Sequence, residues 1–173
     1  MPSATTHDIV TIVTAAAAVP ALLDPAWALP DMSPVNTGVL VGAYLVSGLL
    51  FSPDLDTRSR PYMRWRFLRF LWFPYQRLVS HRSRISHSLV AGPLIRAMYF
   101  AVMLFLVGLA AYFLINLLVP FDPTGTLLQF ARDAALWMQQ HPSTVFYALI
   151  GFILGGATHV LLDTVFTWVK RRF

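Results

Sequence analysis

Four long apolar stretches dominate the sequence and restrict what it can fold into: Ile9–Leu23, Val35–Phe51, Ala97–Val119 and Val145–Val169. A spanning helix needs roughly 17–25 apolar residues, so the last two are long enough to cross a bilayer. The first two are short, and they either cross or pack as a re-entrant or peripheral hairpin. We expect an all-α membrane protein with about four transmembrane or membrane-embedded helices plus interfacial amphipathic helices, forming one compact domain over residues 1–173.

The composition supports this class of protein. Hydrophobic residues make up 57% of the chain and charged residues only 12%, whereas soluble domains carry about 25% charged residues. Cysteine is absent, which excludes disulfides and thiolate metal sites.

The basic residues predict an orientation, because cytoplasmic loops carry the excess of Lys and Arg. Eight of the 13 basic residues lie between Arg58 and Arg84, and three more form the stretch Lys170–Arg172. Loops 24–34 and 120–142 together contain a single Lys or Arg residue, Arg132. Four spans satisfy this distribution with both termini cytoplasmic, in the plasma membrane of a prokaryote or in a thylakoid membrane.

Two further segments are amphipathic. Thr126–Gln140 places apolar residues on one face, which predicts a helix on the outer surface. The stretch Arg60–Tyr75 interleaves Arg with Trp, Phe and Tyr, a composition that suits the lipid headgroup region. Nucleic-acid binding is the rival interpretation of such a stretch, and we do not expect it, because apolar spans flank the segment.

The predicted topology gathers ionisable residues on the cytoplasmic side of the membrane. His159 and Asp163 lie four residues apart inside an apolar stretch, where they share one helix face. Such residues are candidates for function by default. The full group comprises His7, Asp8, Asp54, Asp56, His81, His87, His159 and Asp163. His141 lies on the other side and receives no role.

Histidine and aspartate without cysteine suit Zn, Mn or Fe(II), so we expect one or two divalent ions, with zinc first. A catalytic zinc ion takes about three protein ligands. Eight candidates therefore exceed the needs of one ion, and two-metal sites favour phosphoester hydrolysis. Arg82 and Arg84 could bind a phosphate, or they could equally screen the acids of the site. Taken singly, His7, Asp54, Asp56, His81 and His87 could be surface or turn residues.

Several motifs resemble a family of prokaryotic, largely cyanobacterial, predicted metal-binding membrane proteins. They are THD at 6–8, FSPDLDTRSRPYMRW at 51–65, LRFLWFPY at 68–75, HRSRISHS at 81–88 and ATHVLLD at 157–163. In motif order that family is similar to the YdjM-like predicted membrane-bound metal-dependent hydrolases. The resemblance covers almost the whole chain. It implies metal ligation by His7, Asp54, Asp56, His81, His87, His159 and Asp163, with Asp8 orienting His7.

The expected function is therefore a metal-dependent hydrolase acting on a phosphoester or phospholipid at the cytoplasmic membrane face, with membrane lipid as partner. Asp56 or Asp163 would take the proton of the attacking water. The alternative is a metal-binding membrane protein without catalysis, such as a sensor, a scaffold or a metal-handling protein. A metal-free lipid phosphatase is excluded, because Phe152 and Ile153 stand where its Ser-Arg pair is required.

Overall fold

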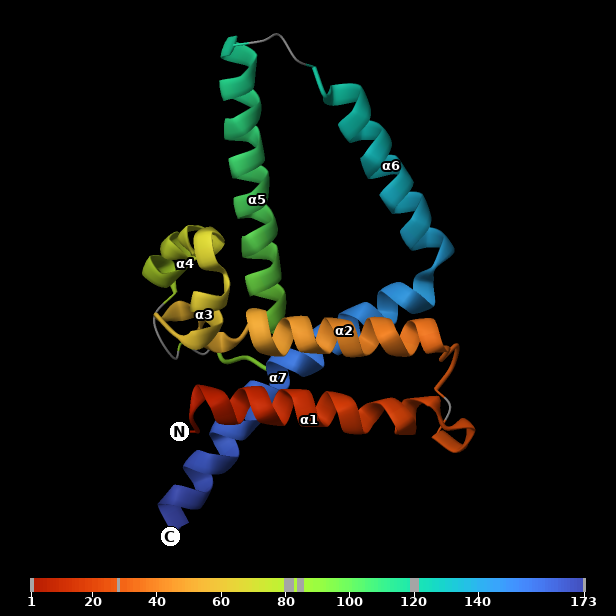
Figure 1. The fold of residues 1–173 in the computed structure, drawn as a ribbon, viewed down its shortest axis with the longest axis vertical. Coiled ribbons are helices and arrows are strands. Elements are labelled where there is room, and N and C mark those ends of the chain that lie inside the picture. Colours follow the sequence, from red (N-terminus) through yellow and green to blue (C-terminus); the bar gives the residue numbers. More distant parts are fainter. Residues whose placement is uncertain (1, 28, 80–82, 84–85, 119–121, 173) are drawn as a thin grey trace.

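The computed structural model describes residues 2–27, 29–79, 83, 86–118 and 122–172. The described chain is helical, with no strand. The longer helices are α1 (Ala4–Leu23), α2 (Pro34–Leu50), α5 (Ala91–Leu118), α6 (Thr124–Gln140) and α7 (Pro142–Arg172) (Figure 1). The shorter elements are η1 (Pro25–Trp27), η2 (Pro53–Asp56), α3 (Arg60–Arg64), η3 (Arg66–Trp72) and α4 (Phe73–Leu78).

Serine caps define the beginnings of the first two helices. The side chain of Ser3 accepts a hydrogen bond from the amide of Thr6 at the start of α1. Ser33 does the same for Asn36, and Pro34 follows it as the first residue of α2. A serine cap stabilises a helix start because its hydroxyl oxygen accepts from a backbone amide that has no partner within the helix. Proline suits the first helical position because it has no amide hydrogen to leave unpaired. The two helices form an antiparallel hairpin (Figure 1).

The helices α2 and α7 run parallel and make the most extensive packing contact between elements. The hydroxyl of Thr144 donates to the Asn36 side chain near the start of both helices, and Ser52 meets His159 at the far end. Between these contacts the backbones approach closely at glycine. A Cβ atom at Gly151 would lie 2.2 Å from the Leu40 carbonyl oxygen. Small residues permit this kind of helix contact in membrane proteins.

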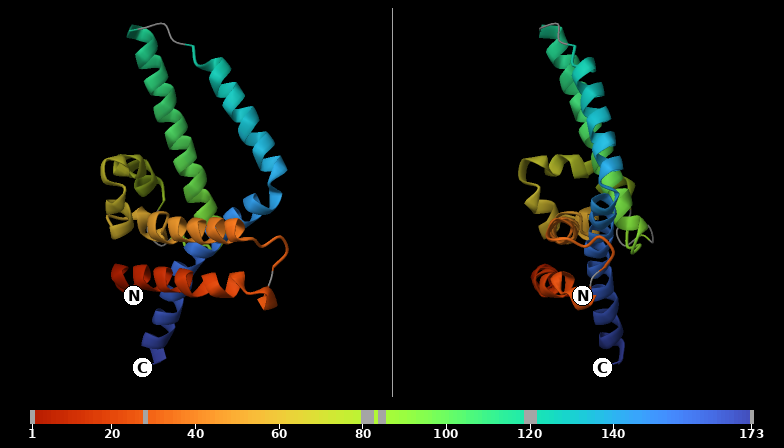
Figure 2. Two further views of the ribbon diagram at one scale, coloured as in Figure 1. Left: turned by 45° about the vertical axis from the view of Figure 1, so that its right-hand side comes forward. Right: turned by 90° about the vertical axis from the view of Figure 1, so that its right-hand side faces the viewer.

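The expectation of a compact bundle is wrong for α5 and α6. Both rise away from the α1–α2 hairpin (Figures 1 and 2). The buried residues of α5 are confined to its first turns, at Gly92, Pro93 and Arg96, and α6 buries none. For α5 the reason is that a helix apolar all round has no stripe that directs it onto a protein core. The helix predicted at Thr126–Gln140 is confirmed, as α6.

The candidate spans match the sequence prediction in number. Among the described residues, four segments are by length and composition apolar enough to cross a membrane, namely Ala4–Leu23, Pro34–Asp56, Ala91–Leu118 and Pro142–Arg172. All four coincide with the apolar stretches read from the sequence.

The segment predicted as an amphipathic stretch at Arg60–Tyr75 folds as a lobe of short helical turns, α3, η3 and α4. Two prolines lie in the first turns of α3 and α4, and Arg66 between them has a φ of 47°. This left-handed backbone interrupts a continuous helix. The lobe packs through Trp72 and Tyr75 onto Phe51 and Leu55.

Candidate metal site

The antiparallel approach of α1 to α7 brings together three side chains that lie far apart in the sequence. His7 comes from the first turns of α1, while His159 and Asp163 lie one turn apart on α7. All three are buried. Their ligand atoms lie within 4.8 Å of one another, and they form the metal-compatible group found among the described residues.

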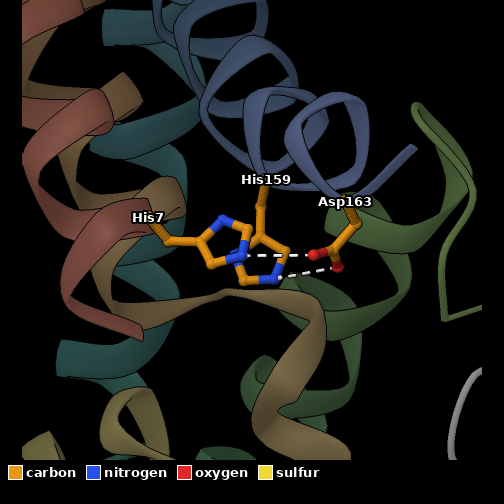
Figure 3. Close-up of side chains that lie close together, drawn as sticks. All are labelled: His7, His159 and Asp163. Carbon is orange, nitrogen blue, oxygen red and sulfur yellow. Dashed lines mark ion pairs between the residues drawn. The ribbon is translucent and has the colours of Figure 1, made fainter. Parts of the chain in front are cut away.

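The carboxylate of Asp163 faces both histidines (Figure 3). Its Oδ1 lies 3.2 Å from Nε2 of His7, and its Oδ2 lies 3.6 Å from Nε2 of His159. The two imidazole rings stack with their centroids 3.7 Å apart. Both Nε2 atoms are therefore held toward the same carboxylate.

The turn η2 adds a second carboxylate. Pro53 opens this turn and Ser52 caps it by accepting from the amide of Asp54. Oδ2 of Asp54 lies 3.5 Å from Nε2 of His159. Its side chain is 29% exposed, compared with 11% for Asp163. Asp54 is thus the carboxylate of this group that solvent reaches most readily.

Asp56 is placed differently from Asp54 although only one residue separates them. It is buried, and its Oδ2 accepts a hydrogen bond of 3.3 Å from the hydroxyl of Ser86. The 3₁₀ turn directs the two carboxylates toward different neighbours. Asp54 therefore faces the histidine pair, while Asp56 faces the segment that precedes α5.

The distances fit a metal ion. Ligand atoms about 2.1 Å from a tetrahedral ion lie about 3.4 Å from one another. The separations of 3.2, 3.5 and 3.6 Å in this group are close to that value. They are also longer than good hydrogen bonds between nitrogen and oxygen, which have a mode near 2.9–3.0 Å.

Unsatisfied polar atoms point to the same conclusion. Nε2 of His159 is buried and has no hydrogen-bond partner among the described residues. A buried nitrogen without a partner costs free energy, and a bound cation would satisfy it. The other ring nitrogen, Nδ1, lies 3.1 Å from the hydroxyl of Ser52. Such a contact fixes the orientation of a ligating imidazole.

His87 is half-buried and lies within electrostatic range of the same acids. Burial lowers the pKa of its imidazole, although Asp56, Asp163 and Asp54 act in the opposite direction. A lowered pKa keeps the ring neutral at pH 7, and the neutral ring is the form that binds metal. The other predicted residues of this segment, His81, Arg82 and Arg84, lie outside the described residues.

The suggestion that Asp8 orients His7 is wrong. The carboxylate of Asp8 pairs with Arg64 and lies 3.8 Å from Arg60. Adjacent residues on a helix point in directions about 100° apart, so Asp8 faces the lobe when His7 faces α7. His141, to which no role was assigned, stacks on Trp137 at the exposed junction of α6 and α7.

Arg96 was missed by the sequence argument. It lies in α5 and is fully buried. Its guanidinium donates to the carbonyl oxygens of Phe51 (2.6 Å) and Ser86 (2.8 Å). It therefore joins the chain just before η2 to the chain just before His87. The available signal was a single charge at the start of an apolar stretch, and such residues are costly in a span.

An apolar cavity of 820 Å³ lies between α1, α2 and α7, with Leu40, Tyr44 and Phe146 in its wall. None of His7, Asp54, His159 and Asp163 lines it. The cavity is therefore separate from the candidate metal site.

The fold and the site together define an all-helical protein with a buried His/Asp group suited to a metal ion. Comparison with known families agrees with this class. The chain belongs to the family described as "Uncharacterized metal-binding protein (DUF2227)", whose profile matches residues 2–173. It is 30% identical to an "Uncharacterized protein" of Aquifex aeolicus (strain VF5) over 136 residues, which cover 74% of this chain and 89% of the relative. No solved structure matches the chain.

The family membership confirms the metal-binding part of the resemblance seen in the sequence. The finer expectations, a YdjM-like hydrolase activity and the choice of zinc, stay predictions.

Proposed function

We propose that this chain is an integral membrane protein that binds a divalent ion through His7, His159 and Asp163 and uses it to hydrolyse a phosphoester. The observation that carries the proposal is the convergence of three ligand atoms from α1 and α7. Three protein ligands leave the fourth position of a tetrahedral ion for water, and Asp54 lies beside the group, with its Oδ2 3.5 Å from Nε2 of His159.

A divalent ion, when bound, supplies Lewis acidity and lowers the pKa of a coordinated water toward about 7. The residues of the chain divide the remaining work. Asp163 faces both histidines and so fixes their positions. Asp54 is the more exposed carboxylate, so it is the better placed to accept the proton of the attacking water. Asp56 faces Ser86, and its role is to hold that segment near the site.

The membrane placement rests on the four apolar helices and on the distribution of arginine. Asp54, in η2 after the end of α2, is followed in the chain by Arg58–Arg77, and Asp163 in α7 is followed by Lys170–Arg172. Cytoplasmic loops carry such residues, so we place the site at the cytoplasmic face of a prokaryotic plasma membrane. The phosphoester is then either a lipid headgroup or a soluble cytoplasmic compound.

Metal handling without catalysis is a second candidate, and the burial of His7, His159 and Asp163 favours it. A structural ion has a closed ligand sphere, whereas a catalytic ion keeps an open position. An exchangeable water on the ion, detected by electron spin echo spectroscopy of the Mn²⁺-loaded protein, would favour the hydrolase. A closed sphere would favour metal handling.

The first experiment is to measure metal content by elemental mass spectrometry. Detergent-purified wild type is compared with His159→Ala, and with His141→Ala, at the exposed junction of α6 and α7, as a control at a histidine outside the site. We expect one or two equivalents of Zn, Mn or Fe in wild type and in the control, and a loss in His159→Ala. Wild type that holds no ion even after reconstitution would remove the basis of the proposal.

Activity is tested next, on a panel of phosphomonoesters, phosphodiesters and phospholipids. We expect turnover by the metal-loaded wild type and the His141→Ala control, and none by His159→Ala. Turnover by a metal-free His159→Ala variant would contradict a metal-dependent reaction. Metal binding without turnover of any of these three substrate classes would favour metal handling without catalysis.

A further inference from the structure

The lobe formed by α3, η3 and α4 exposes three large aromatic side chains. Phe67, Phe70 and Phe73 are 80%, 55% and 51% exposed. Exposed apolar groups that cluster on one short segment mark a surface for a partner or a membrane. Their neighbours Leu71, Trp72 and Tyr75 are buried in the core instead. The segment therefore divides its apolar side chains between an inner face and an outer face.

The charge of the same segment is of one sign. Residues 57–79 contain six arginines and no acid. Arg60 and Arg64 are partly neutralised by Asp8, but Arg66, Arg69 and Arg77 are exposed, and no described carboxylate pairs with them. The guanidinium of Arg77 lies over the ring of Phe73 at 4.4 Å. We call the exposed residues Arg66, Phe67, Arg69, Phe70, Phe73 and Arg77 the arginine–aromatic platform.

The platform is firmly attached to the part of the chain that carries the candidate ligands. The side-chain amide of Gln76 donates to the carbonyl oxygens of Leu55 and Thr57, both at 3.0 Å. Tyr99 of α5 donates to the carbonyl oxygen of Leu71 and accepts from the amide of Tyr75. The platform is thus a fixed surface beside η2.

We propose that the arginine–aromatic platform binds the anionic headgroup layer of a membrane. Each guanidinium complements phosphate charge, and phenylalanine rings on the same surface enter the boundary between headgroups and acyl chains. The inference rests on the proposed membrane placement: the platform lies in the chain between α2 and α5, two helices long and apolar enough to cross a bilayer, and a bilayer is then the phosphate-rich surface beside it. Single-stranded nucleic acid also binds arginine and aromatic rings, and it is the alternative that the experiment must separate.

The experiment uses the absence of cysteine from the chain. A Phe67→Cys variant of the full chain is labelled with an environment-sensitive dye and placed in nanodiscs of phosphatidylcholine, with or without phosphatidylglycerol. Quenching by lipid-bound spin labels reports contact of the dye with the bilayer. We expect stronger quenching with phosphatidylglycerol. An Asp122→Cys label, on an exposed residue away from the platform, should not respond to lipid charge.

The charge contribution is tested by combining Phe67→Cys with Arg66→Gln, Arg69→Gln and Arg77→Gln. Each arginine near an anionic surface contributes about a five-fold change in association, so the triple variant should lose the response to phosphatidylglycerol. Arg132→Gln, an exposed arginine on α6, is the matched control and should keep it. All substituted side chains are exposed, and a helical circular dichroism spectrum equal to that of wild type would show that the fold is intact.

Two outcomes would overturn the inference. Equal quenching in neutral and anionic nanodiscs would show that lipid charge plays no part. Submicromolar binding of a labelled single-stranded oligonucleotide, lost in the triple variant, together with no response to lipid charge, would assign the platform to nucleic acid. Neither outcome depends on metal binding or hydrolysis, so the inference and the proposed function are tested separately.

Discussion

His159 occupies the centre of the candidate site at the scale of single residues. Its Nδ1 meets Ser52, its Nε2 faces Asp54 and Asp163, and its ring stacks on His7. The contacts come from α1, from η2 and its cap, and from α7. The position of this one side chain therefore depends on the packing of three separate segments.

Ser52→Ala tests the orientation of this ring. The variant removes the oxygen that lies 3.1 Å from Nδ1 of His159, and the loss of such a partner lowers metal affinity by about 10- to 100-fold. Affinity is measured by competition with a chelating dye, using Zn²⁺ or Mn²⁺. Ser143→Ala, which loses a hydrogen bond to Asp31 at the other end of α7, should bind as wild type. Equal affinity in both variants would show that Ser52 does not position the ring.

Arg96→Met tests the link between η2 and the segment before α5. The variant leaves the carbonyl oxygens of Phe51 and Ser86 without their donor. Hydrogen bonds to a charged group contribute about 1.5–3 kcal/mol each, so we expect a loss of about 3 kcal/mol or more in the free energy of unfolding. Thermal unfolding in detergent measures it, with the exposed Arg132→Met as the control. A melting temperature equal to wild type would contradict the role of Arg96.

At the scale of elements, the contact between α2 and α7 decides where the ligands lie. Gly151 and Gly155 face the backbone of α2, where any side chain would collide. The glycines are visible in the sequence, but the sequence does not indicate which helix they face. The four apolar stretches could be predicted because the thickness of the bilayer sets the length of a spanning helix. The partner of each helix depends on side-chain shapes that meet only after folding.

Gly155→Ala tests this contact. The new Cβ would lie 2.1 Å from the Tyr44 carbonyl oxygen and 3.0 Å from the amide nitrogen of Gly48, so the two helices must separate. Overpacking costs about 1–3 kcal/mol, and metal affinity should fall too, because His159 follows one turn later. Gly108→Ala on α5 meets nothing within 4 Å.

The Gly108→Ala control should be as stable as wild type or more stable, since alanine favours a helix over glycine by about 1 kcal/mol. The two melting temperatures measured side by side give the comparison. A Gly155→Ala protein as stable as the Gly108→Ala protein would mean that α2 and α7 are not in close contact.

At the scale of the whole molecule, the arrangement is a packed group of α1, α2, α7 and the lobe, from which α5 and α6 project (Figure 2). The His/Asp group lies in the packed part, and the projecting helices contribute Arg96 near their base. The proposed topology places the metal site and both termini on one side of the membrane.

Single-cysteine labelling tests this topology, because the chain has no cysteine of its own. Ser3→Cys and Arg171→Cys should react with a membrane-impermeant maleimide only after cells are permeabilised. Asp122→Cys should react in intact cells, since the 120–142 loop is predicted outside. Reaction of Ser3→Cys and Asp122→Cys from the same side would contradict an odd number of crossings between them.

The sequence by itself determined the helical class, the four apolar stretches and the residue types of a metal site. These features follow from local composition and from the cost of ionisable groups such as His159 and Asp163 in an apolar stretch. Tertiary structure alone decided that the carboxylate of Asp163 faces both His7 and His159, that Asp8 pairs with Arg64, that Asp54 and Asp56 face different neighbours, and that Arg96 is buried. Each of these contacts depends on which face of a helix or turn packs against its neighbour. That face is set by packing between residues up to 156 positions apart in the chain.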